Sequence, residues 1–205
     1  HVGNQTGILM DGKVISIETL RHAYHAAEMY ELMRDVPKAI IVEIGGGLGG
    51  QSYQTMHMSK QVSKYLIFDI PEVAAISSYF LLSAFPNKRV RLFGEGSVSV
   101  DLCEEYDVAV FPHFTINLLP NSSVDLFYNS CSFSEMDRVS SIEYLSIIER
   151  ACRKYFMHDN HDAVFEFRNP DSSTSLNVIG SKLIPNPSLF KRIYKRPRVH
   201  GLPED

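Results

Sequence analysis

The apolar positions of the N-terminal region first follow helical spacing and then form a short continuous run. After Ser16, apolar residues recur at near-helical spacing at Ile17, Leu20, Tyr24, Ala27 and Leu32. This spacing predicts a helix that runs to about Arg34, with Ser16 as its N-cap. Residues 39–44 are almost entirely apolar and β-branched, which is typical of a strand buried on both faces. A glycine cluster ends this strand and opens a predicted helix over residues 49–58.

The same alternation of strands and helices continues along the rest of the chain. Short apolar runs predict strands at residues 65–68, 89–93, 107–111, 124–128, 155–158 and 164–167. The pattern leaves open which of the second and third of these runs is the third core strand. Helices are predicted over residues 72–85 and 134–153. Ser134 and Asp137 have the spacing of a capping box for the latter helix, whose predicted apolar stripe comprises Met136, Val139, Ile142, Leu145 and Ile148.

Strands that alternate with helices predict right-handed βαβ units and a mostly parallel sheet, hence an α/β fold. In such a sheet a ligand binds beyond the carboxyl ends of the strands. This places residues 45–50, Asp69 and residues 129–135 along one predicted rim. The length of 205 residues suits one domain, 1–205, with a mainly helical lead-in over about residues 1–36. The chain begins with His rather than Met, which suggests an excised domain.

Composition narrows the classes of partner. The net charge is -4 and no basic stretch dominates, which argues against nucleic acid as the partner and favours a small neutral or polar ligand. Cys103, Cys131 and Cys152 form no CxxC pair, so neither a zinc knuckle nor a disulfide framework is predicted. We expect a cytoplasmic protein without a membrane partner, because no apolar run approaches the ~20 residues that span a bilayer and no export signal is visible.

Five of the 12 glycines lie between residues 45 and 50, which we call the glycine loop. Glycine permits positive φ and lets a ligand approach the main chain closely. Gly45, Gly47 and Gly50 fit the GxGxxG of dinucleotide-binding folds. Glu43, together with Gly45, Gly47 and Gly49, fits the (D/E)xGxGxG of class I methyltransferases. The loop alone therefore predicts a nucleoside cofactor or, at its simplest, a tight strand-to-helix turn.

Glu43 discriminates between the two cofactors. An acidic group at the end of a buried strand is costly unless it accepts hydrogen bonds or meets a cation. S-adenosylmethionine brings an ammonium and a sulfonium, whereas NAD brings a pyrophosphate that a carboxylate would repel. Asp69 follows the loop at the spacing that reaches ribose hydroxyls in either cofactor, or else it caps the helix that Pro71 opens. None of the ten tyrosines has Lys four residues later, so the Tyr-x-x-x-Lys of short-chain dehydrogenases is missing.

Three segments resemble the bacterial sugar O-methyltransferases, a class I S-adenosylmethionine-dependent group. They are VEIGGGLGG at residues 42–50, LIFDIPE at residues 66–72 and DLFYNSCSFSEM at residues 125–136. The resemblance runs from about residue 3 to residue 160. It implies a Rossmann-like three-layer sandwich with a sheet of about seven strands. It also implies a site with Glu43 and the glycines around the methionine portion and Asp69 on the ribose. The expected cofactor-binding residues are Glu43, Gly45, Gly46, Gly47, Gly49, Asp69, Ile70 and Asn129.

A sugar hydroxyl is a poor nucleophile at neutral pH, so a general base is expected near the fourth or fifth strand. Glu135 and His158 are the catalytic candidates, with His161 as an alternative to His158. Each also has a simpler interpretation, because Glu135 can stabilise a helix start and the histidines can be ordinary loop residues. His113 is a further candidate for the base, with weaker support than the others.

Other polar residues carry weaker hypotheses. His158, His161 and Asp162 form a minor candidate for a metal site, although no metal is expected. Asn129 stands where N-methyltransferases of nucleic acids have (N/D)PPY, but here the run is Asn-Ser-Cys-Ser. His22 and His25 are expected at the surface. The basic tail, Lys191, Arg192, Lys195, Arg196 and Arg198, is expected to be a solvated face.

The sequence thus predicts an S-adenosylmethionine-dependent O-methyltransferase that acts on a hydroxyl of a sugar or glycoside. The alternatives are an NAD-binding oxidoreductase and a non-catalytic binding domain that retains the fold. A homo-oligomer is left open. The residues do not specify which sugar or which hydroxyl is the acceptor.

Overall fold

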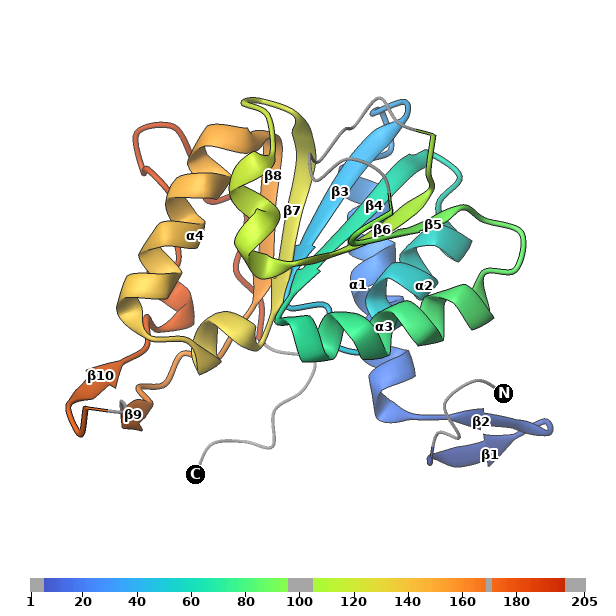
Figure 1. Ribbon diagram of the computed structural model, residues 1–205, viewed down its shortest axis with the longest axis horizontal. Coiled ribbons are helices and arrows are strands. Elements are labelled where there is room, and N and C mark those ends of the chain that lie inside the picture. The colour runs from blue at the N-terminus through green and yellow to red at the C-terminus, as the bar shows by residue number, and fades with distance from the viewer. Residues whose placement is uncertain (1–5, 96–104, 169–170, 198–205) are drawn as a thin grey trace. The chain divides into compact units, whose positions relative to one another are not determined.

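The computed structural model of the protein describes residues 6–95, 105–168 and 171–197. These residues belong to two compact units, residues 1–119 and residues 120–205, and each unit has its own helices and parallel strands (Figure 1). The expectation of a single domain, and of one rim shared by the glycine loop and residues 129–135, stays a prediction.

The first unit alternates strands and helices. In chain order its elements are β1 (Ile8–Met10), β2 (Lys13–Ile15), α1 (Ile17–Leu32), β3 (Ala39–Ile44), α2 (Gly50–Met58), β4 (Val62–Asp69), α3 (Pro71–Ala84), β5 (Val90–Leu92), β6 (Val108–Pro112) and the 3-10 helix η1 (His113–Leu118). Four of the strands lie side by side in the order β5, β6, β4, β3, and all three pairings are parallel. The carboxyl ends of β3, β4 and β6 therefore lie at one edge of this sheet.

The central strands are the most apolar part of the first unit. Ile41, Val42, Leu66 and Ile67 are fully buried in β3 and β4, as the all-apolar runs predicted. β6 pairs with β4, whereas β5 lies outside β6 at the end of the sheet. Residues 107–111 therefore contain the third core strand, which the sequence had left open.

The helix starts of the first unit follow the local sequence. The Ser16 side chain accepts the backbone N–H of Thr19 at 3.1 Å, so the predicted N-cap of α1 is confirmed. Pro71 occupies the first turn of α3, where its missing N–H costs nothing. The lead-in is not only helical, because β1 and β2 form an antiparallel hairpin before α1. Asp11 and Gly12 turn the hairpin, both with positive φ.

The second unit contains one parallel pair and one antiparallel hairpin. Its elements are β7 (Val124–Ser130), the 3-10 helix η2 (Ser132–Glu135), α4 (Arg138–Ala151), β8 (Cys152–Asp159), β9 (Glu166–Arg168), β10 (Thr174–Leu176) and the 3-10 helix η3 (Gly180–Lys182). β7 and β8 run parallel with Asn129 opposite His158, and β9 pairs with β10. The strand predicted at residues 164–167 corresponds to β9, which begins two residues later.

The predicted start of the long helix in the second unit was wrong. α4 begins at Arg138, and the Asp137 carboxylate caps it by accepting the N–H of Ser140 at 2.8 Å. Ser134 instead lies in η2 and bonds to residues that follow β8. The predicted apolar stripe is only partly right: Ile148 is buried, whereas Val139 and Ile142 are 68% and 48% exposed. The other buried residues of α4 are Ser141, Ile147 and Ala151.

The α/β fold class is confirmed. Among the described residues, six strands take part in parallel pairing rather than about seven, and helices flank them. None of the helices within the described ranges combines the length and apolar character needed to span a membrane.

Candidate functional site

The glycine loop leaves β3 through a series of backbone conformations that favour glycine. Gly45, Gly47 and Gly49 have φ values of 74°, 53° and 91°. A Cβ on Gly46 would lie 2.5 Å from Cγ2 of Ile67, so a side chain has no room there. The loop is therefore fixed in shape by both its dihedral angles and its contact with β4.

Three of the six backbone N–H groups of the glycine loop donate hydrogen bonds to oxygens of the protein. The N–H of Gly45 donates to the carbonyl of Phe68 at 2.8 Å, and that of Gly49 donates to the carbonyl of Gly46 at 2.9 Å. The N–H of Gly47 donates to Oδ2 of Asp69 at 2.8 Å. These bonds hold the loop closed against the end of β4.

Asp69 ends β4 and uses both carboxylate oxygens. While Oδ2 accepts from Gly47, Oδ1 accepts the N–H of Ile70 at 2.8 Å. Asp69 does not cap α3, because the N-cap is Ile70 and no side chain bonds there. Burial raises the pKa of Asp69, while the two backbone hydrogen bonds and the nearby His113 oppose the rise. Each oxygen has a further lone pair, so the carboxylate can still accept ligand hydroxyls.

Glu43 is buried in β3, one strand away from Asp69. Its side chain is only 3% exposed, and Tyr65 Oη donates a hydrogen bond to Oε2 at 3.0 Å. Burial raises the pKa of Glu43 from 4.5 to about 8, and the nearby Asp69 adds to the rise. The hydrogen bond from Tyr65 and the charge of Arg21 oppose the rise. A Cβ on Gly46 would lie 3.4 Å from Oε2, so the carboxyl touches the glycine loop. Of the two partners that the sequence left open for this acid, a hydrogen bond is present, from Tyr65, which the sequence did not identify. The contact with a cofactor's cation stays a prediction.

His25 is buried in the first unit, which corrects the expectation that it is a surface residue, whereas His22 is only partly buried. The His22 ring fills the space over Gly50 at the start of α2, where a Cβ would lie 2.6 Å from Cε1. His25 is 4% exposed, and its Nδ1 lies 3.2 Å from Glu28 Oε2. The reason is that α1 packs on α2, which turns this face of α1 inward.

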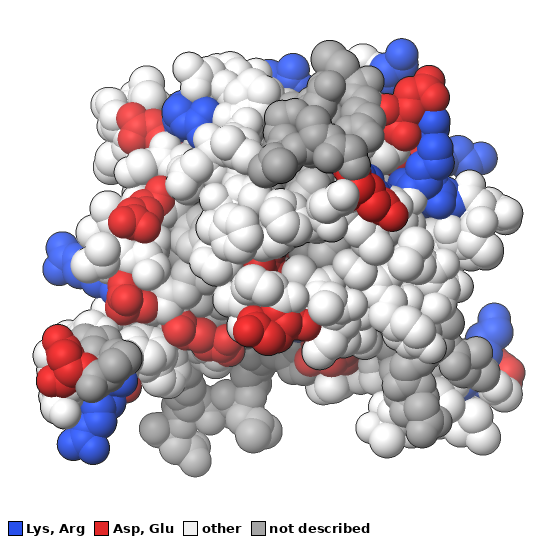
Figure 2. Space-filling model, viewed as in Figure 1, with Lys and Arg blue, Asp and Glu red and all other residues white. Residues whose placement is uncertain are grey.

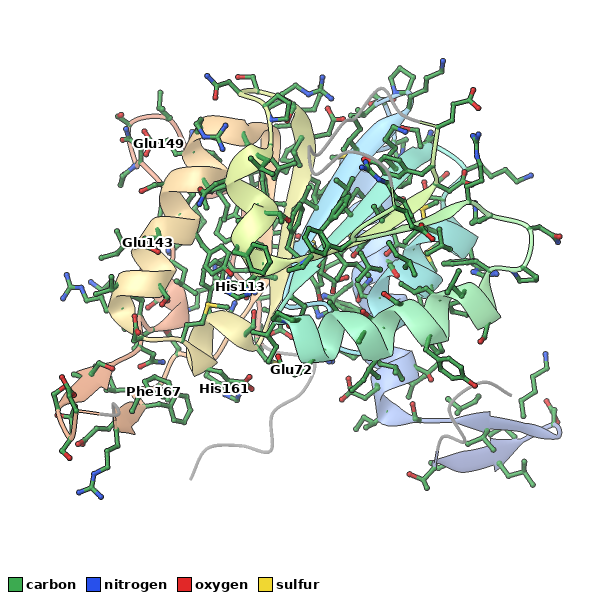
Figure 3. All side chains as sticks on the ribbon, in the orientation of Figure 1. Glu72, His113, Glu143, Glu149, His161 and Phe167 are labelled. Carbon is green, nitrogen blue, oxygen red and sulfur yellow. The ribbon has the colours of Figure 1, made fainter. Side chains whose placement is uncertain are left out.

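His113 joins the same edge from β6. Pro112 pairs in register with Asp69, and His113 follows it as the first residue of η1 (Figure 3). His113 is close enough to act electrostatically on Asp69. Its Nδ1 is buried and has no hydrogen-bond partner among the described residues. A buried nitrogen without a partner is costly, so this atom is a candidate for a ligand contact.

Asn129 in the second unit is engaged in a buried polar cluster. Its Oδ1 accepts from Nδ2 of Asn160 at 2.7 Å, and its Nδ2 donates to Ser132. Oδ1 of Asn160 in turn accepts the N–H of Ser134 at 3.1 Å, and Ser134 Oγ accepts the N–H of His161 at 2.8 Å. The cluster ties the end of β7 to the segment after β8. Asn160 and Ser134 were not singled out by the sequence, and the cofactor contact of Asn129 stays a prediction.

The catalytic candidates of the second unit differ in surroundings. Glu135 is exposed at the end of η2, outside the helix in which it was expected. His158 lies in β8 with its ring 5.1 Å from that of Phe156, and burial lowers its pKa to about 4. It is therefore neutral at pH 7 and a weak base. His161 follows β8, and its ring lies 5.6 Å from that of Phe165. The catalytic assignment of Glu135 and His158 stays a prediction.

The minor metal hypothesis is not supported. Within the described ranges, no three His, Cys, Asp or Glu side chains gather as a metal site would require. Asp162 has other partners, because it accepts the N–H of Ser181 at 2.8 Å and pairs with Lys195 at 2.8 Å. The basic tail is therefore not only solvated, because its Lys195 is ion-paired. Arg198 lies outside the described residues.

Surface charge is mixed. On the face drawn in Figure 2, the described Lys and Arg side chains stand in separate small groups, with Asp and Glu side chains between them. This face therefore lacks the broad positive surface that a nucleic-acid backbone calls for, and the expectation of a partner other than nucleic acid stays a prediction.

Comparison of the sequence with protein-family models and with curated proteins found no match. The structure is similar to solved structures, several of which are described as methyltransferases. With a SAM-dependent methyltransferase from Leishmania major it has a TM-score of 0.50 and 11% identity, over 79% of this chain and 59% of that one. With the mitomycin 7-O-methyltransferase the values are 0.47 and 15%, over 77% and 40%. With the pyocyanin biosynthetic protein PhzM they are 0.42 and 13%, over 78% and 54%.

The chain therefore spans about half of the length of these three structures. At such low identity, structural similarity shows the fold alone. The fold assignment rests on the Leishmania structure, because the TM-scores of the other two are below 0.5. The chain has the Rossmann-like α/β fold of the class I S-adenosylmethionine-dependent methyltransferases.

Proposed function

We propose that the chain binds S-adenosylmethionine at the carboxyl edge of β3, β4 and β6, and that it transfers the methyl group to a hydroxyl of a sugar or sugar-containing metabolite. The observation that carries the proposal is the buried carboxyl of Glu43 against the glycine loop. An acid in this place suits a ligand with a positive charge, because a buried charge needs a partner of opposite sign.

The bonding of the glycine loop favours this cofactor over NAD. Loops that hold a pyrophosphate offer free backbone N–H groups to the phosphate oxygens. Here the N–H groups of Gly45, Gly47 and Gly49 already donate to protein oxygens. A pyrophosphate would also approach two carboxyl groups, those of Glu43 and Asp69. S-adenosylmethionine has no phosphate, so it needs none of these donors.

Each residue of the edge has a proposed function in binding. Glu43 accepts the ammonium of the methionine portion, and Asp69 accepts the ribose hydroxyls through its remaining lone pairs. Ile70, half exposed beside Asp69, offers an apolar contact to the nucleoside. His113 Nδ1 offers a further hydrogen-bonding atom.

The bound cofactor would supply a methyl carbon already activated by a sulfonium, so the protein's main task is to align the acceptor and exclude water. A base that removes the hydroxyl proton would assist. Glu135 and His158 are the proposed bases. Glu135 is exposed to water, whereas His158 is buried, neutral at pH 7 and weakly basic.

Calorimetric titration with S-adenosylhomocysteine tests the cofactor, and transfer of labelled methyl groups to a panel of sugars tests the acceptor. We expect saturable one-to-one binding and methylation of at least one sugar. A folded sample that fails to bind S-adenosylhomocysteine would contradict the proposal. Binding without transfer to any sugar would instead favour the non-catalytic alternative.

A further inference from the structure

Glu43 is a buried acid to which the described part of the chain brings no close cation. The residue is 3% exposed, and its carboxyl accepts one hydrogen bond from the described residues, from Tyr65 Oη at 3.0 Å. No Lys, Arg or His within the described ranges lies at ion-pair distance from it. An ionised carboxylate in such a place would lack the partners that normally offset its loss of water.

The charged and titratable groups around Glu43 come from the two elements beside it. Tyr65 and Asp69 belong to β4, and Arg21 belongs to α1. Burial and Asp69 disfavour a negative charge on Glu43, whereas Tyr65 and Arg21 favour it, and burial is the largest of the four effects. The pKa of about 8 means that the carboxyl holds its proton at neutral pH while the site is empty.

We propose that ligand binding exchanges this proton for the ligand's ammonium group, with Tyr65 as the residue that positions the ionised Glu43 carboxylate. The inference rests on the proposed function, because it assumes the ammonium of S-adenosylmethionine or its product as the ligand. In the exchange, the O–H bond of Glu43 breaks and the proton leaves to solvent. A charge-assisted N–H···O hydrogen bond to the ammonium replaces it.

Two consequences follow from this exchange. The first is that about one proton leaves for each ligand bound at a pH well below the Glu43 titration. The second is that the dissociation constant falls about tenfold for each rise of one pH unit in the same range, because the proton competes with the ammonium. An acid that was already ionised in the empty site would give neither effect.

Calorimetric titration with S-adenosylhomocysteine in phosphate and in imidazole buffer measures the proton count, because the two buffers differ in ionisation enthalpy. We expect close to one proton released per site at pH 6.5, and a dissociation constant about tenfold lower at pH 7 than at pH 6. Glu43→Gln should abolish the release. Tight binding by the unchanged protein with no proton release would overturn the inference and leave the proposed function intact. No binding at any pH would overturn the proposed function itself.

Tyr65→Phe tests the positioning residue. The ring stays in the core, but the ionised carboxylate loses its hydrogen bond, so we expect affinity about tenfold weaker at pH 6.5 with the proton release retained. Tyr106→Phe is the matched control, because Tyr106 is also buried in the first unit and its ring contacts Lys64 and Arg91 instead. It should leave both affinity and proton release unchanged. Equal effects of the two variants would overturn the assignment of Tyr65.

Discussion

The carboxylate of Asp69 accepts the backbone N–H of Gly47 at 2.8 Å, which links the end of β4 to a loop 22 residues earlier in the chain. The acid that was expected to bind a ribose therefore also holds the glycine loop in place. The two tasks are compatible, because the second lone pair of each oxygen points elsewhere.

Asp69→Ala should lower affinity for S-adenosylhomocysteine by more than tenfold, because it removes the ribose acceptor and releases the loop. It should also cost about 1 kcal/mol of folding stability through the lost hydrogen bonds. Calorimetry and urea unfolding measure the two effects. Asp107→Ala is the control, since Asp107 Oδ2 likewise accepts a backbone N–H, that of Arg89 at 2.8 Å, before β6 begins. Asp107→Ala should lower stability and leave ligand binding unchanged. An equal loss of binding in both variants would remove Asp69 from the site.

Gly47→Ala should be destabilising by about 1 kcal/mol, because its φ of 53° lies in the left-handed region. A Cβ at this position meets nothing within 4 Å, so strain alone sets the cost in the free protein. Gly12→Ala is the control, because Gly12 in the β1–β2 turn also has a positive φ and a Cβ there would likewise meet nothing within 4 Å. We expect similar shifts in urea midpoint from the two variants and weaker ligand binding only from Gly47→Ala. Unchanged binding would mean that no ligand approaches the main chain of the loop.

Glu43→Gln should change how stability depends on pH. The folded state holds the Glu43 proton up to about pH 8, whereas the unfolded chain releases it near 4.5. The folded state therefore binds more protons between these values, and stability falls as pH rises through this window. Gln keeps an acceptor for Tyr65 but cannot ionise, so the variant should gain a few kcal/mol over the unchanged protein at pH 8 and little at pH 4.5. Urea unfolding without ligand at both pH values measures this. Parallel pH profiles would contradict the proton assignment.

His113→Ala should weaken ligand binding several-fold while leaving the free protein nearly as stable. Its Nδ1 has no partner among the described residues, so truncation breaks no hydrogen bond of that atom. His57→Ala serves as a comparison, because His57 Nδ1 lies 2.8 Å from the Tyr53 carbonyl oxygen and its ring stacks on Phe85. That variant should lose stability and keep affinity. The reverse pattern would assign His113 to packing alone.

Asn160→Ala should destabilise the second unit by about 2 kcal/mol or more, because it removes the buried hydrogen bonds of Asn160 with Asn129 Oδ1 and with the N–H of Ser134. Asn121→Ala removes an exposed hydrogen bond to Arg150 and should cost little. Chemical unfolding of both variants tests the difference. If the two variants are equally stable, the Asn129 cluster does not hold the strand ends together.

Local sequence was sufficient for much of the first unit. The β-branched run predicted β3, Ser16 predicted the start of α1, and Glu43 with the glycines predicted the shape of the loop. The β1–β2 hairpin was missed although Asp11-Gly12 is a dipeptide favoured in such turns, so the signal was present in the sequence. These features depend on neighbours within a few residues, which is why the sequence reports them.

Other features depend on contacts between distant residues, which only the tertiary structure decides. Ser134 had the spacing of an N-cap, but its Oγ accepts the N–H of His161, 27 residues away, and Asp137 caps α4 at Arg138 instead. The sequence predicted His25 at the surface, but the packing of α1 on α2 buries it. The sequence by itself determined that an acid would end a buried strand before a glycine loop. The tertiary structure decided that burial raises the pKa of this acid and that Tyr65 opposes the rise, because burial and hydrogen-bond partners arise only when the strands pair.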